Sequence, residues 1–285
     1  MDPVIARKML RTLEPYHGAV YFVAEGPDEY AKLGITDRMM GYFGSRAAPM
    51  GAVSADVVIA TFFNFHPAMV RKRVPEVWTI ASPAQLLDAR HRAINTALRR
   101  ILGDAIDSDE VRTASEIARR AAEACTPEGR PLYAGHASLP WPDEPHMALW
   151  HAQSLLREYR GDGHIAAMCV EGLDGCEALV THAAQGDVPA AALQGSRQWP
   201  DDEWNAAVDR LRSRGWIASD DITFTDLGRE RRAWIEQRTD ELAMRPWDAI
   251  GEDNCTTLRG LVRPWSKAIV ESGELGFARP AQSSD

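Results

Sequence analysis

The stretch DDEWNAAVDRLRSRGWIASDDITFTDLGR, residues 201–229, decides the fold that we predict for this chain. Trp204 and Leu211 recur at helical spacing, and Gly215 follows them as a helix stop. The run WIASDDITF then predicts a short β-hairpin, because two short apolar segments flank a pair of aspartates. Thr225 precedes a long polar and apolar run and is a typical N-terminal cap. The stretch therefore predicts a helix, a hairpin and a second long helix.

With the helices expected before it, this stretch resembles the MarR-type winged helix over residues 145–243. The runs RGWI at 214–217 and TDLGR at 225–229 carry that resemblance. The whole chain also resembles an uncharacterised, mainly actinobacterial family with a predicted C-terminal helix-turn-helix. That second resemblance rests on GYFGSRAAPMG (41–51), FFNFHP (62–67), PWPDEPHMALWHA (140–152) and REYRGDGH (157–164). Together they imply a mainly α fold, with an N-terminal helical domain and a C-terminal winged-helix domain that contains one short β-hairpin.

Helix signals dominate the rest of the chain. Ser82-Pro83 opens an amphipathic run that ends before Gly103, which predicts a helix up to Leu102. Residues 128–145 contain four prolines and two glycines, so we interpret them as an ordered loop at a domain boundary. The predicted division is a helical ligand domain at 1–135 and a winged-helix-like domain with C-terminal helices at 136–285.

Composition and charge limit the classes of function. The chain has 285 residues, a net charge of −9 and 45% hydrophobic residues, without an apolar run long enough to cross a membrane. The first residues carry charges throughout and lack a secretory signal, so we expect a cytoplasmic protein that does not bind membranes. Residues 1–135 hold 17 Lys+Arg against 16 Asp+Glu, whereas residues 136–285 hold 15 against 25. The acidic part of the chain is therefore the part that resembles a DNA-binding fold.

This acidity argues against DNA reading by the winged helix. The helix expected to enter the DNA groove starts with Asp201, Asp202 and Glu203, and the tip of the hairpin carries Asp220 and Asp221. Like charges brought together at an interface cost several kcal/mol, and phosphate would face these carboxylates. We therefore assign no residue to nucleic-acid binding.

Candidate ligand and catalytic residues lie in the first domain, which matches no common catalytic motif. His17 and Tyr21 are four positions apart and are expected to share a helix face. Arg46 lies among small residues and would hold an anionic group of a ligand. Asn64 and His66 precede Pro67 at a helix end, from where side chains can point into a cleft.

Each candidate also has a purely structural explanation. His17 would then be a hydrogen-bonded core histidine, and Asn64 would cap a helix end. Arg46 would form a buried salt bridge with Glu14 or Glu25.

The second domain supplies Trp141, Asp162 and His164 as further candidate ligand residues, and Asp162 would also be an ordinary N-cap. The histidines lack H-x-x-x-H spacing and the four cysteines form no C-x-x-C pair, so no metal site is predicted. We expect the candidates of both domains to line one pocket between them.

The sequence leaves three functions open. The first is a protein that binds or converts a small molecule on a winged helix that no longer reads DNA, with His17 or His66 as general acid or base. Either histidine could also be the single axial ligand of a haem, although no motif indicates one. The second is a ligand-responsive MarR-like regulator, which would form a homodimer and bind an operator. The third is a structural partner protein that uses the acidic winged helix as an interaction face.

Overall fold

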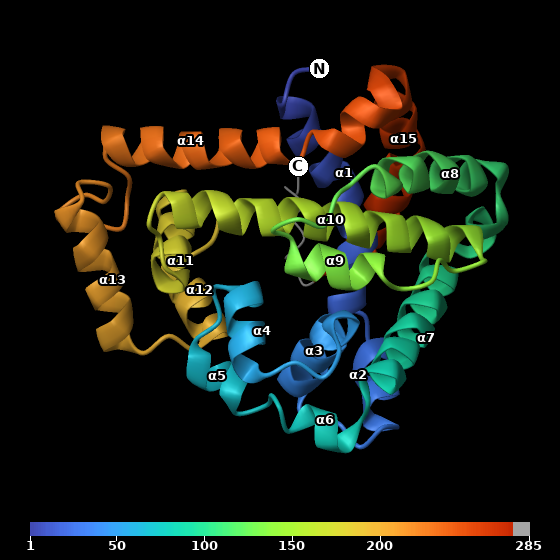
Figure 1. The fold of residues 1–285 in the computed structure, drawn as a ribbon, viewed down its shortest axis with the longest axis horizontal. Coiled ribbons are helices and arrows are strands. Elements are labelled where there is room, and N and C mark those ends of the chain that lie inside the picture. The colour runs from blue at the N-terminus through green and yellow to red at the C-terminus, as the bar shows by residue number, and fades with distance from the viewer. Residues whose placement is uncertain (276–285) are drawn as a thin grey trace, which may run out of the picture.

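The computed structural model describes residues 1–275, which fold into fifteen α-helices and three short 3₁₀ helices (Figure 1). The α-helices are α1 Val4–Gly18, α2 Glu25–Ala31, α3 Arg38–Ala47, α4 Ala55–Phe62, α5 Pro67–Arg71, α6 Val77–Ile80, α7 Pro83–Leu102, α8 Asp109–Glu123, α9 Pro131–Ala137, α10 Pro145–Val170, α11 Gly175–Ala184, α12 Ala190–Arg197, α13 Asp201–Ser213, α14 Asp226–Leu242 and α15 Arg245–Glu271. The 3₁₀ helices are Ala19–Tyr21, Ala48–Met50 and Gly103–Asp107. The predicted mainly α class is confirmed.

Local capping explains where several helices begin. Helix α7 starts after Ser82, whose side chain accepts a hydrogen bond from the Gln85 amide while the Gln85 side chain accepts one from the Ser82 amide. The helix ends at Leu102, and Gly103 follows with a φ of 55°, a backbone conformation that favours glycine. The predicted helix is therefore confirmed at both ends. The loop predicted at 128–145 contains a short helix, α9, so only part of that segment is irregular.

The largest core joins the two ends of the described chain. It is built from α1, α7, α8, α10 and α15, and Trp150 of α10 is buried near its centre. The Trp150 indole Nε1 donates a hydrogen bond to the His17 carbonyl at 3.3 Å, so the polar edge of this large side chain is satisfied. Because this core takes residues from both sides of position 136, the division into 1–135 and 136–285 stays a prediction.

A second core is formed by buried side chains of α3 to α7 and is rich in aromatic rings. Phe43, Phe62 and Phe65 pack with ring centroids 5.0 to 6.4 Å apart, so Phe62 and Phe65 are core residues. Gly44 permits this packing, because a Cβ atom there would lie 2.7 Å from Cγ2 of Val77. The small residues around Arg46 therefore allow helices to approach one another closely.

The third core contains residues of α11, α12 and α13 together with the end of α10 and the middle of α14. Between α13 and α14 the predicted β-hairpin is wrong, because residues 216–225 form no strand and only one isolated bridge, Ile217 to Phe224. Only two backbone hydrogen bonds cross this turn in the described residues, from the Ala218 amide to the Thr223 carbonyl at 2.9 Å and from the Thr225 amide to the Trp216 carbonyl at 3.0 Å. The Trp216 amide donates instead to the Leu211 carbonyl at the end of α13, and the Thr225 hydroxyl accepts from the Gly228 amide as the N-cap of α14. Because both ends of the segment serve the flanking helices, the pairing is too short to form strands.

The start of α14 also lies very close to this segment. A Cβ atom on Gly228 would come within 2.0 Å of the Trp216 carbonyl oxygen, so only glycine fits at this contact. The TDLGR run that suggested a winged helix thus has a packing role, although the hairpin is absent from the described residues.

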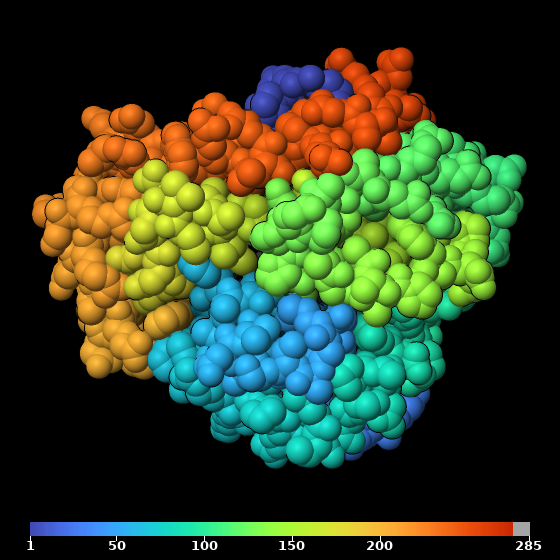
Figure 2. Space-filling model, in the orientation of Figure 1, coloured from blue at the N-terminus to red at the C-terminus, as the bar shows by residue number. Residues whose placement is uncertain are grey.

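Helices α4 and α5 lie directly against α11 and α12, as Figures 1 and 2 both show. The contact is made by hydrogen bonds. The His66 amide donates to the Arg197 carbonyl at 3.1 Å, and Nε1 of Trp199 donates to the Asn64 carbonyl at 2.9 Å. The segment between α12 and α13 is therefore attached to the N-terminal half of the chain.

Candidate functional site

Two adjoining cavities lie where α3, α4, α10 and α12 meet. The larger has a volume of about 390 Å³ and the smaller about 200 Å³. They share part of their walls, and the shared residues are Tyr42, Arg46, Phe65, Arg157 and Arg197. Three of these five side chains are guanidinium groups, so the common wall is positively charged.

Arg46 is held at this wall by α3. Its Nη2 lies 3.3 Å from Oε2 of Glu158 and its Nη1 donates to the Tyr42 hydroxyl at 2.8 Å. The guanidinium carbon lies 4.5 Å from the centre of the Phe62 ring. The salt-bridge partner is therefore Glu158 of α10, and not Glu14 or Glu25.

Glu158 links a second arginine to the same cluster. Nη1 of Arg157 donates to Oε2 of Glu158 at 2.6 Å, and Nε of Arg157 lies 3.7 Å from Oε1 of Glu14. Burial alone would raise the pKa of Glu158, but Arg157 and Arg46 hold it well below its usual value. Burial raises the pKa of Glu14. Glu158 thus keeps its charge in a water-poor environment.

Arg197, at the end of α12, differs from these two arginines. Its guanidinium carbon lies 4.6 Å from the centre of the Phe65 ring, and its Nη1 donates to the Ser196 hydroxyl at 3.2 Å. Within residues 1–275, no carboxylate lies within 4.0 Å of it, and its buried Nε has no hydrogen-bond partner. Burial lowers the pKa of Arg197, and the nearby Arg46 lowers it further. Arg197 is therefore a cation that is available to a ligand.

The predicted site residues are brought together only in part. Tyr21 and Arg46 line the larger cavity, and Arg46, Asn64, Asp162 and His164 line the smaller one. His17, His66 and Trp141 line neither.

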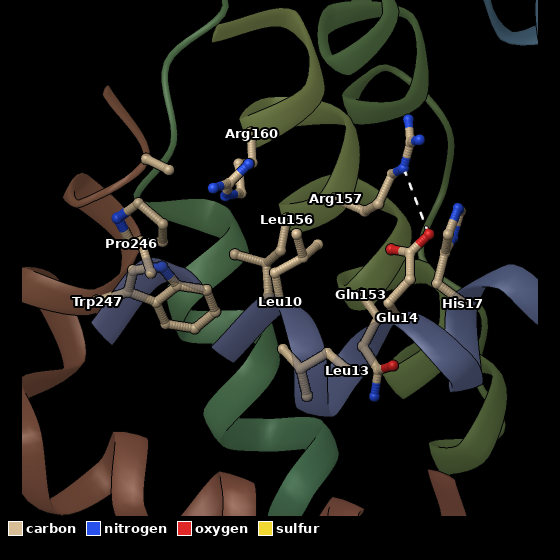
Figure 3. Close-up of a pocket in the computed structure, with 12 residues that line it drawn as sticks. Leu10, Leu13, Glu14, His17, Gln153, Leu156, Arg157, Arg160, Pro246 and Trp247 are labelled. Carbon is tan, nitrogen blue, oxygen red and sulfur yellow. Dashed lines mark ion pairs between the residues drawn. The ribbon is translucent and has the colours of Figure 1, made fainter. Parts of the chain in front are cut away.

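His17 faces a third, much smaller space, shown in Figure 3. This space measures about 10 Å³, enough for about one water molecule. The Ser154 hydroxyl donates to the Trp150 carbonyl at 3.0 Å, so His17 Nδ1, 2.8 Å from the Ser154 oxygen, carries the proton. Nε2 of His17 is then an acceptor with no partner in the described chain. Burial holds the pKa of His17 well below its usual value, and the space around it does not fit a haem.

His66 has a positioning role in the structure. It caps α5, where its Nδ1 accepts from the Ala68 amide at 3.3 Å, and its Nε2 lies 3.1 Å from Oε1 of Glu203. Its ring meets the Trp199 ring edge-on at 5.0 Å. His66 therefore joins the first half of the chain to the start of α13.

Tyr21 contacts both candidate regions. Its ring lies edge-on to the His17 ring at 5.5 Å, although Tyr21 ends the 3₁₀ helix Ala19–Tyr21 and does not belong to the α-helix of His17. The Tyr21 hydroxyl accepts a hydrogen bond from Nη2 of Arg90 at 3.2 Å. Trp141 lies elsewhere, edge-on to His151 at 4.8 Å and beneath Arg119 at 4.6 Å.

Asp162 and His164 lie within α10. The predicted N-cap role of Asp162 is wrong, because α10 continues through it from Pro145 to Val170. Its Oδ2 accepts a hydrogen bond from the Tyr133 amide at 2.9 Å, and burial raises its pKa to about 6. Nδ1 of His164 lies 2.9 Å from the Thr239 hydroxyl, and burial lowers its pKa to about 4. The smaller cavity thus contains a carboxyl group that titrates near neutral pH.

Sequence reasoning did not select Arg157, Arg197 and Tyr42 as site residues. Arg197 ends a short helix in a segment without a recognisable motif, so no local signal distinguishes it from an ordinary surface arginine. Its importance depends on the contact between α12 and the α4–α5 segment, which is a tertiary feature.

Among residues 1–275, no group of three or more His, Cys, Asp or Glu side chains is placed to hold a metal ion. In the same part of the chain, no helix is both long enough and apolar enough to cross a membrane.

A comparison with protein families matches a helix-turn-helix family over residues 6–276. The chain belongs to this helix-turn-helix family. No curated protein and no solved structure matches it. The family match covers nearly the whole chain. It therefore includes the N-terminal segment that lines the cavities as well as the segment around residues 201–229. The actinobacterial origin and the MarR resemblance stay predictions.

The first turn of α13 is where a DNA-reading helix would contact bases, and here two of its three carboxylates, those of Asp201 and Glu203, have partners in the protein. Oδ1 of Asp201 accepts from Nε2 of Gln194 at 2.8 Å, and Glu203 contacts His66. This acidic helix start lies against the N-terminal half of the molecule.

Proposed function

We propose that this member of the helix-turn-helix family binds a small anionic molecule in the two adjoining cavities. The observation that carries the proposal is Arg197, a half-buried cation that has no carboxylate partner within residues 1–275 and lies at the wall that the cavities share. A planar guanidinium can bind a carboxylate or phosphate through two parallel hydrogen bonds. Arg46 and Arg157 add positive charge around the same point.

The remaining walls indicate the rest of the ligand. Phe22, Tyr30 and Tyr42 line the larger cavity together with Phe65, beneath Arg197. A volume of about 390 Å³ lies in the range typical of sites for small molecules. We propose a ligand with an aromatic or apolar body and one anionic group, which would lie between Arg197 and Arg46.

In this proposal the helix-turn-helix unit, α12 and α13, no longer reads DNA bases and instead supplies a wall of the ligand site. The acidic start of α13 supports this, because Asp201, Asp202 and Glu203 would face phosphate. If the ligand is also converted, Asp162 is better placed for proton transfer than His17 or His66, since it lines the smaller cavity and has a pKa of about 6.

The test is ligand binding measured by calorimetry and thermal shift, with a panel of aromatic carboxylates and aromatic phosphates. Arg197→Met should weaken binding of the best ligand about 10- to 100-fold, as expected for one charged hydrogen-bonding group. Arg197→Lys should retain part of the affinity because it keeps the charge. Arg71→Met is the matched control, since Arg71 is exposed and pairs with Asp56 at 2.8 Å.

Two results would contradict the proposal. One is a ligand whose affinity is the same in wild type and in Arg197→Met. The other is sequence-specific DNA retardation at low salt by a homodimer, abolished by substitutions in the first turn of α13. That result would favour a ligand-responsive regulator instead.

A further inference from the structure

A second positively charged feature is an open groove lined by α1 and α15, whose lining residues are not shared with the two cavities. The groove has a volume of about 530 Å³. Five of its lining residues are cations, and these are Lys8, Arg11, Arg259, Arg263 and Lys267. In a chain with a net charge of −9, this is a strong local excess of positive charge.

Most of these cations have no carboxylate partner. Within residues 1–275, only Lys267 lies within 4.0 Å of a carboxylate, that of Glu271 at 3.6 Å. Arg259 donates instead from Nε to the Thr12 hydroxyl at 3.3 Å. Elsewhere, surface arginines such as Arg100 and Arg210 each contact two carboxylates. The groove therefore gathers four cations, Lys8, Arg11, Arg259 and Arg263, that have no carboxylate within 4.0 Å in residues 1–275.

The groove is also built on a fixed base. The Ser266 hydroxyl donates to the Thr12 carbonyl at 2.7 Å, which ties α15 to α1 at the floor. Arg259, Arg263 and Lys267 recur every four residues along one face of α15. Each step of four residues advances about 6 Å along a helix, so these three cations span about 12 Å. Lys8 and Arg11 stand on the opposite wall, on α1.

We infer that this groove binds the phosphate backbone of a DNA duplex without reading its sequence. Cations spread over two walls of an open groove suit an extended polyanion better than one compact phosphate. Backbone contacts of this kind carry no sequence information and depend on the release of counterions from the nucleic acid. The inference is independent of the proposed small-molecule site, because no residue lines both the groove and the two cavities.

The experiment is fluorescence anisotropy of a labelled DNA duplex of about two helical turns, titrated with the full chain at low and increasing salt. Engagement of four to five cations predicts a slope of about −4 in log affinity against log salt. The double variant Arg259→Glu/Arg263→Glu should weaken binding at least tenfold and reduce the slope by about two. The control, Arg71→Glu/Lys72→Glu, makes the same change in net charge at exposed positions of α5 and should keep the wild-type slope.

Several results would overturn the inference. The first is that wild type does not bind the duplex at low salt. The second is that the groove variant and the control variant lose the same amount of duplex affinity. The third is that inorganic tripolyphosphate binds in the groove but the duplex does not. Circular dichroism of each variant separates loss of binding from loss of folding. Arg197→Met should leave duplex binding unchanged, so failure of this inference and failure of the proposed small-molecule site are distinguishable.

Discussion

The cluster of Arg46, Arg157 and Glu158 and the groove between α1 and α15 use the same cationic side chains in opposite ways. In the cluster, the buried carboxylate of Glu158 contacts two arginines, which lower its pKa and so keep it ionised. In the groove, cations project from two helices and only Lys267 contacts a carboxylate within the described residues. Arginine content alone therefore does not identify an anion site. The relevant quantity is how many cations remain without a partner, and whether water reaches them.

The largest effect is expected from Glu158→Gln. This change leaves the buried Arg46 and the half-buried Arg157 without their shared carboxylate, and breaking the buried Arg46–Glu158 pair costs about 3–5 kcal/mol of unfolding free energy. Urea unfolding monitored by circular dichroism measures it. Glu271→Gln is the control, because the Lys267–Glu271 pair is exposed and its loss should cost less than about 0.5 kcal/mol. Equal effects at the two sites would show that the cluster is not a stabilising unit.

A smaller effect concerns His17, which adjoins the buried cluster. Its folded-state pKa lies well below that of the unfolded chain, because burial disfavours the charged form. The unfolded state therefore takes up the proton first, so stability is fully present above about pH 6.5 and is lost as pH falls below it. Between pH 7 and 5 the loss from this one group is about 2 kcal/mol.

The check is a comparison of wild type and His17→Gln by urea unfolding at several pH values. The variant should lose about 2 kcal/mol less than wild type between pH 7 and 5, whatever its stability at pH 8. Parallel curves for the two proteins would mean that His17 does not stay neutral in the folded state.

The smallest effect is expected in the groove. Arg263 is exposed and has no carboxylate partner in the described residues, so Arg263→Gln should change the unfolding free energy by less than about 0.5 kcal/mol. Urea unfolding at low salt is the measurement. A loss of 2 kcal/mol or more would show that this arginine holds the two helices together, which would remove the contrast with the buried cluster.

Features that depend on neighbours in the sequence were predicted well. The helix from Pro83 to Leu102 was predicted at both ends because its cap and its glycine stop lie within the segment itself. The β-hairpin was predicted wrongly because the ends of its segment serve the flanking helices: the Trp216 amide donates to the end of α13, and Thr225 caps α14. Only the Ile217–Phe224 bridge pairs the two sides of the turn in the described residues.

The candidate site was predicted less completely, because it depends on contacts between distant parts of the chain. Arg46 was selected as a ligand residue, and its structural alternative, a buried salt bridge, is observed; its partner Glu158 is 112 positions away and could not be chosen over nearer glutamates. Asp162 was selected as a ligand residue, and only its structural alternative, a cap at the start of its own helix, is wrong. Arg197 was missed, since only the packing of α12 against α4 and α5 brings it to the cavities.

The packing of α1 against α15 has a consequence for biosynthesis. Met9 and Leu13 of α1 belong to the same buried core as Leu258 and Val262 of α15, which the ribosome makes about 240 residues later. At a translation rate of about 5–20 residues per second, roughly 10–50 s pass between the synthesis of α1 and the synthesis of α15. The face of α1 that packs on α15 therefore stays without this partner until α15 has been made.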